Sequence, residues 1–392
     1  MTIPLNPGRS SAAKGPVTEP IRVMVVDDAI VVRGLLTRWI DEHPNLAVVA
    51  THRNGKLAVD DLLRSDPEVV VLDIEMPEMD GLTALPLMLR QKPDLVVVMA
   101  STLTKRNAEI SLKALSLGAT DYIPKPDGNR GVTTSQDFRR ELVDKVASLG
   151  EQRRLRKGRP LASIARGVAP KPAAAEAARK PATAAPAAPM AKSSVLRGPA
   201  AALVIGSSTG GPQALTGLFA QIGKDITRLP VFIVQHMPPT FTSILAEHIA
   251  KASGRPAAEG QDGEMVGPGR IYVAPGGMHM TLTGNRSAPR IRIADGPLIN
   301  YCKPAVDPLF ESAAEIYGGG LLGMVLTGMG HDGAKGAKAI MNAGGQIIAQ
   351  DEASSVVWGM PGAVVGAGAY SQIVPLNEIG GRFSRLQSGG RP

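Results

Sequence analysis

Short apolar runs that alternate with longer amphipathic segments constrain the fold of this chain more than any other feature. Runs that are apolar throughout are typical of strands covered on both faces, as in parallel sheets. In the first 150 residues they are separated by segments with helical spacing, and they lie at Arg22–Val26, Ala47–Ala50, Val69–Leu72, Val96–Ala100 and Asp121–Ile123. This part is therefore predicted to be a doubly wound α/β domain, with its functional residues at the carboxyl ends of the strands.

The part after residue 200 shows the same alternation. Buried strands are expected at Ala202–Ile205, Val231–Val234 and Gly323–Leu326, and shorter ones, read as an antiparallel edge, at Ile271–Ala274 and Ile291–Ile293. Segments such as GPQALTGLFAQI and SILAEHIAKAS have helical spacing. The fold class expected is thus α/β, with two doubly wound parallel-sheet domains.

A segment rich in alanine, proline and basic residues separates the two parts. Residues 151–200 carry eleven Lys/Arg against two Glu, a charge of +9, so the rest of the chain is close to neutral in a protein of net charge +8. Such a composition cannot bury a core and is typical of a flexible tether. We expect a disordered N-terminus (1–20), a first domain (21–148), a linker (149–199, its first residues helical) and a second domain (200–385). Salt-dependent nucleic-acid binding by the linker is the alternative interpretation.

Length and composition agree with a two-domain cytoplasmic protein. A chain of 392 residues is long for a single core. No apolar run approaches the roughly 18 residues of a membrane span, and the first twenty residues lack the apolar core of a signal peptide. The single cysteine, Cys302, cannot form an internal disulfide, which fits a reducing compartment.

Polar residues follow the predicted strands of the first domain. VMVVDDA ends in Asp27 and Asp28, VVVLD ends in Asp73, MAST supplies Ser101 and IPKP supplies Lys125. Neighbouring carboxylates are unfavourable unless a cation offsets their charge, and oxygen-rich pockets suit Mg²⁺. A carboxylate beside Mg²⁺ can accept a phosphoryl group, which a lysine and a hydroxyl then contact.

These residues resemble the receiver domains of response regulators, over nearly all of 21–148. The resemblance rests on VVDD, LDIEMPEMDG, the hydroxyl of MAST and the lysine of IPKP. It implies that Asp73 is the phosphoacceptor, that Ser101 and Lys125 contact the phosphoryl group and that Tyr122 is the switch aromatic. It also implies Mg²⁺ held by Asp27, Asp28, Asp73 and the carbonyl of Glu75.

The stretch LVIGSSTGG raises a choice between a phosphate-binding loop and a serine nucleophile. No lysine follows the glycines, as a Walker loop requires, and Ser208 stands where a dinucleotide fingerprint needs glycine. The stretch does match G-x-S-x-G, in which glycines permit the sharp strand-to-helix turn that exposes a serine. The pentapeptide occurs in ordinary turns as well.

A nucleophilic serine needs a base and a residue that orients it. His236 follows VFIVQ and Asp332 follows a third strand, so both fall beside Ser208 at strand ends. The residues alone leave His331 open as the base. They also leave Asp262, Asp295 and Asp307 open as the orienting carboxylate.

The second domain resembles the chemotaxis protein-glutamate methylesterases, the CheB family. The shared motifs are IGSSTGGPQAL, VQHMPPTFT, APGGMHM, LTGMGHDGAKG and QDEASSVVWGMPGAV, and receiver, linker and esterase follow one another in that family. The resemblance implies Ser208 as nucleophile, His236 as base and Asp332 as the orienting residue. It also implies Met329 as an oxyanion donor through its backbone N–H, with Thr209 and His279 as supporting residues. His331 departs from the motif, where asparagine is expected.

The function implied is a phosphorylation-regulated esterase without a cofactor of its own. It would remove methyl groups from γ-glutamyl methyl esters of methyl-accepting chemoreceptors and deamidate specific glutamines, with a chemotaxis histidine kinase as phosphodonor. We expect the unphosphorylated receiver to cover the esterase site. The alternatives are a receiver fused to a DNA-associated output domain or to a non-catalytic one.

Overall fold

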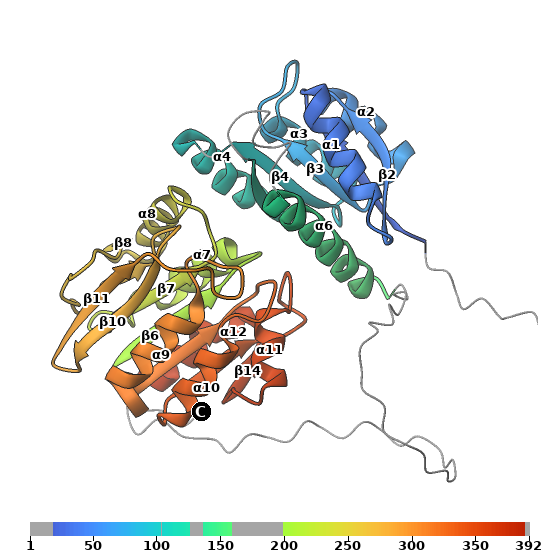
Figure 1. The fold of residues 1–392 in the computed structure, drawn as a ribbon. Helices are drawn as coiled ribbons and strands as arrows, with labels where there is room; N and C mark the ends of the chain where they lie inside the picture. The colour runs from blue at the N-terminus through green and yellow to red at the C-terminus, as the bar shows by residue number, and fades with distance from the viewer. Residues whose placement is uncertain (1–18, 103, 126–135, 159–198, 389–392) are drawn as a thin grey trace, which may run out of the picture.

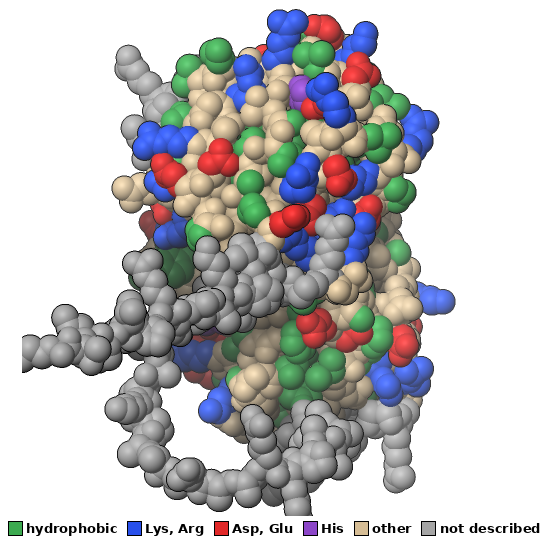
Figure 2. Space-filling model, turned by 90° about the vertical axis from the view of Figure 1, so that its right-hand side faces the viewer, with side chains coloured by type: hydrophobic (Ala, Val, Ile, Leu, Met, Phe, Trp, Pro, Cys, Tyr) green, Lys and Arg blue, Asp and Glu red, His purple; other side chains and the backbone are tan. Residues whose placement is uncertain are grey.

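The protein, seen in a computed structural model, is described over residues 19–102, 104–125, 136–158 and 199–388. Most of the expected disordered N-terminus and linker therefore lies outside the described residues. Within these ranges no helix is both long enough and apolar enough to cross a membrane. On the face drawn in Figure 2, basic and acidic side chains are interspersed rather than gathered in one basic patch.

The first domain alternates strand and helix along its length (Figure 1). Its strands are β1 (Ile21–Val26), β2 (Leu46–His52), β3 (Val69–Asp73), β4 (Val96–Thr102) and β5 (Asp121–Lys125). Its helices are α1 (Ile30–Asp41), α2 (Gly55–Ser65), α3 (Gly81–Gln91), α4 (Lys105–Ser116) and α6 (Gln136–Arg156).

Side-chain caps mark where three of these helices begin. Asn54, Asp80 and Thr104 precede α2, α3 and α4 and each accepts a hydrogen bond from a backbone N–H of the first turn. Short polar side chains at this position satisfy donors that have no partner within the helix. The caps fix the lengths of the loops that carry the functional residues.

The five strands form one parallel sheet in the order β2-β1-β3-β4-β5. Helices α1 and α6 pack on one face, and α2, α3 and α4 on the other. The strand order reverses between β1 and β3, so their carboxyl ends flank the crevice in which α/β proteins hold ligands. The α/β fold predicted for this part is confirmed.

The second domain contains nine strands and six α-helices among the described residues. The strands are β6 (Ala202–Ser207), β7 (Val231–Gln235), β8 (Ala257–Glu259), β9 (Ile271–Val273), β10 (His279–Asn285), β11 (Ala288–Ala294), β12 (Leu321–Val325), β13 (Gln346–Gln350) and β14 (Gln372–Val374). The helices are α7 (Gly211–Ile222), α8 (Phe241–Ser253), α9 (Val306–Tyr317), α10 (Ala334–Asn342), α11 (Met360–Gly366) and α12 (Leu376–Gln387), with a 3₁₀ turn at Gly318–Gly320.

Seven of these strands form a fully parallel sheet in the order β14-β13-β12-β6-β7-β9-β8. Helices α7, α8 and α12 cover one face, and α9, α10 and α11 the other. β9 runs parallel to β7 inside this sheet, so the expected antiparallel edge at Ile271–Ala274 is wrong. The antiparallel pair is β10 with β11, which forms a separate ribbon.

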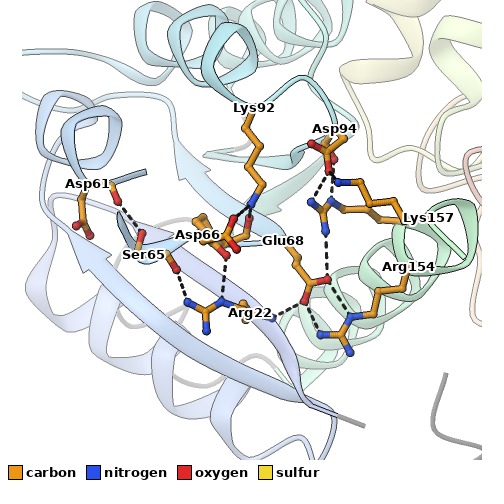
Figure 3. Close-up of polar contacts among 11 residues, drawn as sticks. Arg22, Asp61, Ser65, Asp66, Glu68, Lys92, Asp94, Arg154 and Lys157 are labelled. Atoms are coloured by element: carbon orange, nitrogen blue, oxygen red, sulfur yellow. Dashed lines mark hydrogen bonds and ion pairs between the residues drawn. The ribbon is translucent and has the colours of Figure 1, made fainter. Parts of the chain in front are cut away.

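The last turns of α6 are fastened to the amino-terminal edge of the first sheet by buried charges (Figure 3). Glu68, just before β3, is 2% exposed and accepts hydrogen bonds from Arg153, at 3.1 Å, and from Arg154, at 2.9 Å. Asp94 pairs with Arg153 and Lys157. Helix α6 runs on to Arg156, so the first residues of the predicted linker are helical, as expected, and they pack on the first domain.

The two domains pack directly against each other. The ring of Tyr122, on β5, stacks on Phe241, on α8, with centroids 4.7 Å apart and planes inclined by 6°. The Gln213 side chain, on α7, donates to the carbonyl of Ala119 at 2.9 Å. The first domain therefore lies on the side of the second that carries α7 and α8.

Candidate active site

Ser208 is the first residue beyond β6, the central strand of the larger sheet. Strands β6 and β7 pair through Ser207 and Gln235, so Ser208 and His236 leave the sheet side by side. The sheet order reverses at β6, because β7 lies on one side and β12 on the other. This is where the crevice of a doubly wound sheet opens.

The glycines that follow Ser208 permit a tight turn into α7. Gly210 has a φ of 77°, in the left-handed region that favours glycine. A Cβ at Gly211 would lie 1.9 Å from Oε1 of Gln235, so a larger residue there would displace the Gln235 side chain. The amino terminus of α7 is thereby held beside Ser208. The Gly211 N–H donates to the Ser208 carbonyl at 2.7 Å and Pro212 has no N–H, so it is the helix dipole that favours negative charge there.

His236 and Asp332 form a buried pair. Nε2 of His236 lies 2.8 Å from Oδ2 of Asp332, and the two side chains are 11% and 2% exposed. Burial alone would raise the pKa of Asp332, but the hydrogen bond and charge of His236 and further donors lower it below its usual value. The carboxylate is therefore held in its charged form, facing the imidazole.

Cys302 contacts the other nitrogen of the same ring, a contact that sequence reasoning missed. Its Sγ lies 3.3 Å from Nδ1 of His236. Burial opposes charge on the imidazole, but Cys302 and Asp332 outweigh it and raise the pKa of His236 to about 10. No local pattern signals this contact, since Cys302 follows no strand and stands in a turn before α9.

The ring orientation determines which nitrogen can act as a base. If Nε2–H donates to Asp332, Nδ1 keeps its lone pair and is the nitrogen left to accept a proton. Among the described residues the Ser208 hydroxyl has no hydrogen-bond partner. Catalytic hydrogen bonds are often completed only when substrate is bound.

The three supporting residues expected from the sequence lie in different places. Among the described residues the backbone N–H of Met329 has no acceptor, as an oxyanion donor requires. The Thr209 carbonyl accepts from the hydroxyl of Thr327 at 2.9 Å, which ties the turn to the next loop. His279 begins β10, bonds the Pro297 carbonyl at 2.9 Å and so supports the loop before α9.

The alternative candidates for base and orienting residue lie elsewhere. His331 is exposed. Asp262 and Asp295 are on the surface, where they contact Arg292 and Lys303. Asp307 is buried but contacts Asp332 through its backbone N–H rather than the imidazole. Of these candidates, the structure brings His236 and Asp332 together, at the strand ends where Ser208 also lies.

A second constellation lies at the carboxyl edge of the first sheet. The carboxylate oxygens of Asp27, Asp28 and Asp73 lie within 4.8 Å of one another, and Nζ of Lys125 lies 2.7 Å from both Asp27 and Asp73. Burial raises the pKa of Asp73 to about 6, against the opposing effect of Lys125. Clustered hard oxygen ligands around a desolvated carboxylate suit Mg²⁺.

The remaining expected residues of this first site surround the carboxylates. Ser101 is buried at the end of β4, and its hydroxyl lies 2.8 Å from that of Ser111, on α4. Glu75 lies in the exposed loop that follows Asp73. Tyr122 is buried against the second domain, as described above.

Both halves of the chain match known protein families. The response regulator receiver domain family matches residues 23–134, and the CheB methylesterase family matches residues 203–383. The crystal structure of the Thermotoga maritima CheB methylesterase catalytic domain is 38% identical, with a TM-score of 0.46, and covers 48% of this chain and 98% of its own.

Curated relatives match almost the whole chain. A protein of Rhodopseudomonas palustris (strain HaA2) is 55% identical over 95% of this chain and 96% of its own, and is named protein-glutamate methylesterase/protein-glutamine glutaminase. A protein of Bradyrhizobium diazoefficiens, of the same name and assigned to a group 2 operon, is 52% identical over 98% of both chains. A DNA-associated or non-catalytic output domain finds no support among them. The chain belongs to the protein-glutamate methylesterase/protein-glutamine glutaminase family, with a receiver domain followed by a CheB-type catalytic domain.

Proposed function

We propose that Ser208, His236 and Asp332 hydrolyse γ-glutamyl methyl esters on methyl-accepting chemoreceptors and deamidate specific receptor glutamines. The observation that carries this proposal is the buried His236–Asp332 pair, set beside Ser208 at the switch point of the sheet. A serine, an imidazole and a carboxylate in this arrangement are the minimum for acyl transfer.

In the acylation step, Oγ of Ser208 attacks the ester carbonyl while Nδ1 of His236 takes its proton. Asp332 stabilises the imidazolium that forms. The backbone N–H of Met329 donates to the oxyanion, supported by the amino terminus of α7. The imidazolium then protonates the leaving group, which departs as methanol from an ester or as ammonia from a glutamine.

In the deacylation step, His236 takes a proton from water, which attacks the acyl-serine. The products are a receptor glutamate and free Ser208. The carbonyl carbon is the same in ester and amide, so one site serves both substrates and only the leaving group differs.

Asp73 is the proposed phosphoacceptor, with a chemotaxis histidine kinase as donor. Asp27, Asp28, Asp73 and the carbonyl of Glu75 would hold Mg²⁺, which neutralises charge on the incoming phosphoryl group. Lys125 and Ser101 would contact the phosphoryl oxygens. Ser101 must then leave Ser111, which links phosphorylation to the position of α4.

The receiver is proposed to inhibit the esterase by covering its site. Three residues of α6 reach loops that flank the site: Arg140 lies 4.7 Å over the ring of Tyr301, Ser148 contacts Sδ of Met329 and Arg156 donates to the Ser355 carbonyl. Phosphorylation would weaken this packing. The linker between the domains keeps the receiver at high effective concentration in either state.

The remaining assignments follow from this activity. The functional units are 21–148, to which the last turns of α6 belong as far as Arg156, and 200–385. The enzyme acts in the cytoplasm, where receptor methylation sites and a kinase are accessible. The esterase half needs no cofactor, because the proposed residues supply nucleophile, base and oxyanion donor.

The test is product release by the purified full chain with a small-molecule phosphodonor and Mg²⁺. Methanol is measured from methylated receptor membranes and ammonia from a receptor with unmodified glutamines. Ser208→Ala is expected to reduce both rates by about 10³–10⁶-fold. The matched control is Ser207→Ala, whose hydroxyl bonds Gln235 instead, and it should retain turnover. Equal losses in the two variants would contradict the assignment of the nucleophile.

A further inference from the structure

The Asp332 carboxylate is held by more donors than the imidazole alone. Its Oδ2 accepts from the backbone N–H of Val306 at 2.6 Å as well as contacting His236. Its Oδ1 accepts from the backbone N–H groups of Asp307 and Gly333 and, at 3.1 Å, from Nδ2 of Asn300. In the described part of the chain, Asn300 is the one side chain besides His236 that donates to this carboxylate.

The same amide bridges two buried acids. Nδ2 of Asn300 also lies 3.1 Å from Oδ2 of Asp307, so both of its hydrogens are used. Asp307 is 6% exposed, and burial followed by the charge of Asp332 raises its pKa. Without the bridge, two neighbouring carboxylates would compete for one proton. After burial, which opposes it, His236 and the Val306 N–H lower the pKa of Asp332 most, and the amide of Asn300 adds to their effect while tying Oδ1 to Asp307.

The backbone explains how this amide reaches the site. Ile299 and Cys302 exchange hydrogen bonds of 3.1 and 2.8 Å across a tight turn. Asn300 and Tyr301, between them, have φ values of 52° and 64°. Asparagine tolerates this left-handed conformation better than most residues. The turn presents Asn300 to the carboxylate and Cys302 to the imidazole, at opposite ends of one catalytic pair.

We propose that Asn300 is a positioning residue for the hydrolysis, acting through Asp332 by bridging it to Asp307. This inference rests on the proposed function, since it assumes that Asp332 orients the base. Asn300 does not touch substrate. Its loss should therefore lower kcat and leave KM unchanged.

The decisive experiment is a double-mutant cycle in the full chain, with phosphodonor and Mg²⁺ present. Asn300→Gly keeps the turn, because glycine accepts positive φ, but removes the amide. It should lower kcat about 10- to 100-fold, the usual range for a lost hydrogen bond to a charged group. In the Asp332→Asn background, followed by single turnover, the same change should have less than about a twofold effect, since its target is gone.

Asn300→Asp is a second test, in case Asn300→Gly fails to fold. It retains the shape of the side chain and replaces the bridge with a third carboxylate, so kcat should fall at least as far as in Asn300→Gly. Thermal unfolding of each variant shows which of the two is folded at the assay temperature.

Three results would overturn the proposal. The first is a kcat within twofold of the parent in a folded Asn300 variant, and the second is an effect of the substitution on KM rather than on kcat. The third is a double variant whose loss in rate equals the product of the losses of Asn300→Gly and Asp332→Asn. The Ser208→Ala control separates this failure from failure of the proposed function. If activity survives Ser208→Ala, the proposed function is wrong. If activity requires Ser208 but is unchanged by substitution of Asn300, only the role inferred for Asn300 is wrong.

Discussion

At the scale of single residues, the members of the candidate active site differ in how far they could be foreseen. Ser208, His236 and Asp332 follow buried strands, and strand ends meet at one edge of a parallel sheet. Asn300 and Cys302 belong to a turn that reaches the pair through tertiary packing. No local pattern signals such a contact, so these two residues required the structure.

The first prediction concerns Cys302 and the base. Cys302 contributes to the raised pKa of His236, about 10, and only neutral imidazole can accept a proton. Cys302→Ala should lower that pKa, so the acidic limb of the kcat/KM profile should shift to lower pH. The measurement is the pH dependence of methanol release under activating conditions. An unchanged limb would show that Cys302 does not influence the base.

The second prediction concerns the phosphoacceptor and stability. The pKa of Asp73 is raised to about 6 in the folded state, so the unfolded chain loses this proton first as pH increases. The free-energy cost of holding Asp73 ionised in the folded state is absent below about pH 4 and complete above about pH 6. Asp73→Asn should therefore stabilise the receiver by up to about 3 kcal/mol at pH 7, and by little at pH 4. Denaturant unfolding at both pH values tests this, and a difference independent of pH would contradict it.

At the scale of elements, the sequence predicted strands and helices better than it predicted pairing. The valine-rich runs that became β1, β3 and β4 are apolar throughout and were correctly placed. The direction of β9, three residues long, is set by pairing with β7, which no local pattern encodes. Strand β13, QIIAQ, also went unpredicted, since two glutamines frame its short apolar centre.

The third prediction concerns the attachment of α6. Glu68→Ala leaves Arg153 and Arg154 without their buried partner, which usually costs about 3–5 kcal/mol. We expect the end of α6 to lose protection against hydrogen exchange and the receiver to unfold at lower denaturant. The matched control is Glu42→Ala, which removes the exposed partner of Arg139 on the same helix and should change neither property. Similar losses in the two variants would refute a special role for Glu68.

At the scale of the whole molecule, the contact between domains links the two chemical sites. Tyr122 lies on β5, the strand that ends in Lys125, and stacks on Phe241 at the start of α8. Helix α6 reaches the turn at Tyr301 and the loop at Met329. A change at Asp73 can therefore reach the loops around Ser208 through direct contacts between the two domains.

The fourth prediction tests that route. Arg140→Ala removes the contact with Tyr301 and should raise the basal esterase rate of the unphosphorylated chain. Arg139→Ala, one residue away and paired within the receiver, should leave that rate unchanged. A chain that begins near residue 198 should be faster than both. If it is no faster than the unphosphorylated full chain, inhibition by occlusion is wrong.

The most direct test of a phosphorylation-gated serine esterase is methanol release from methylated receptor membranes, with and without a small-molecule phosphodonor and Mg²⁺. The full chain should respond to the phosphodonor, Asp73→Ala should keep only its basal rate, and Ser208→Ala should lose at least about 10³-fold in either condition. A rate that rises equally with and without Asp73, or that survives the loss of Ser208, would contradict the account.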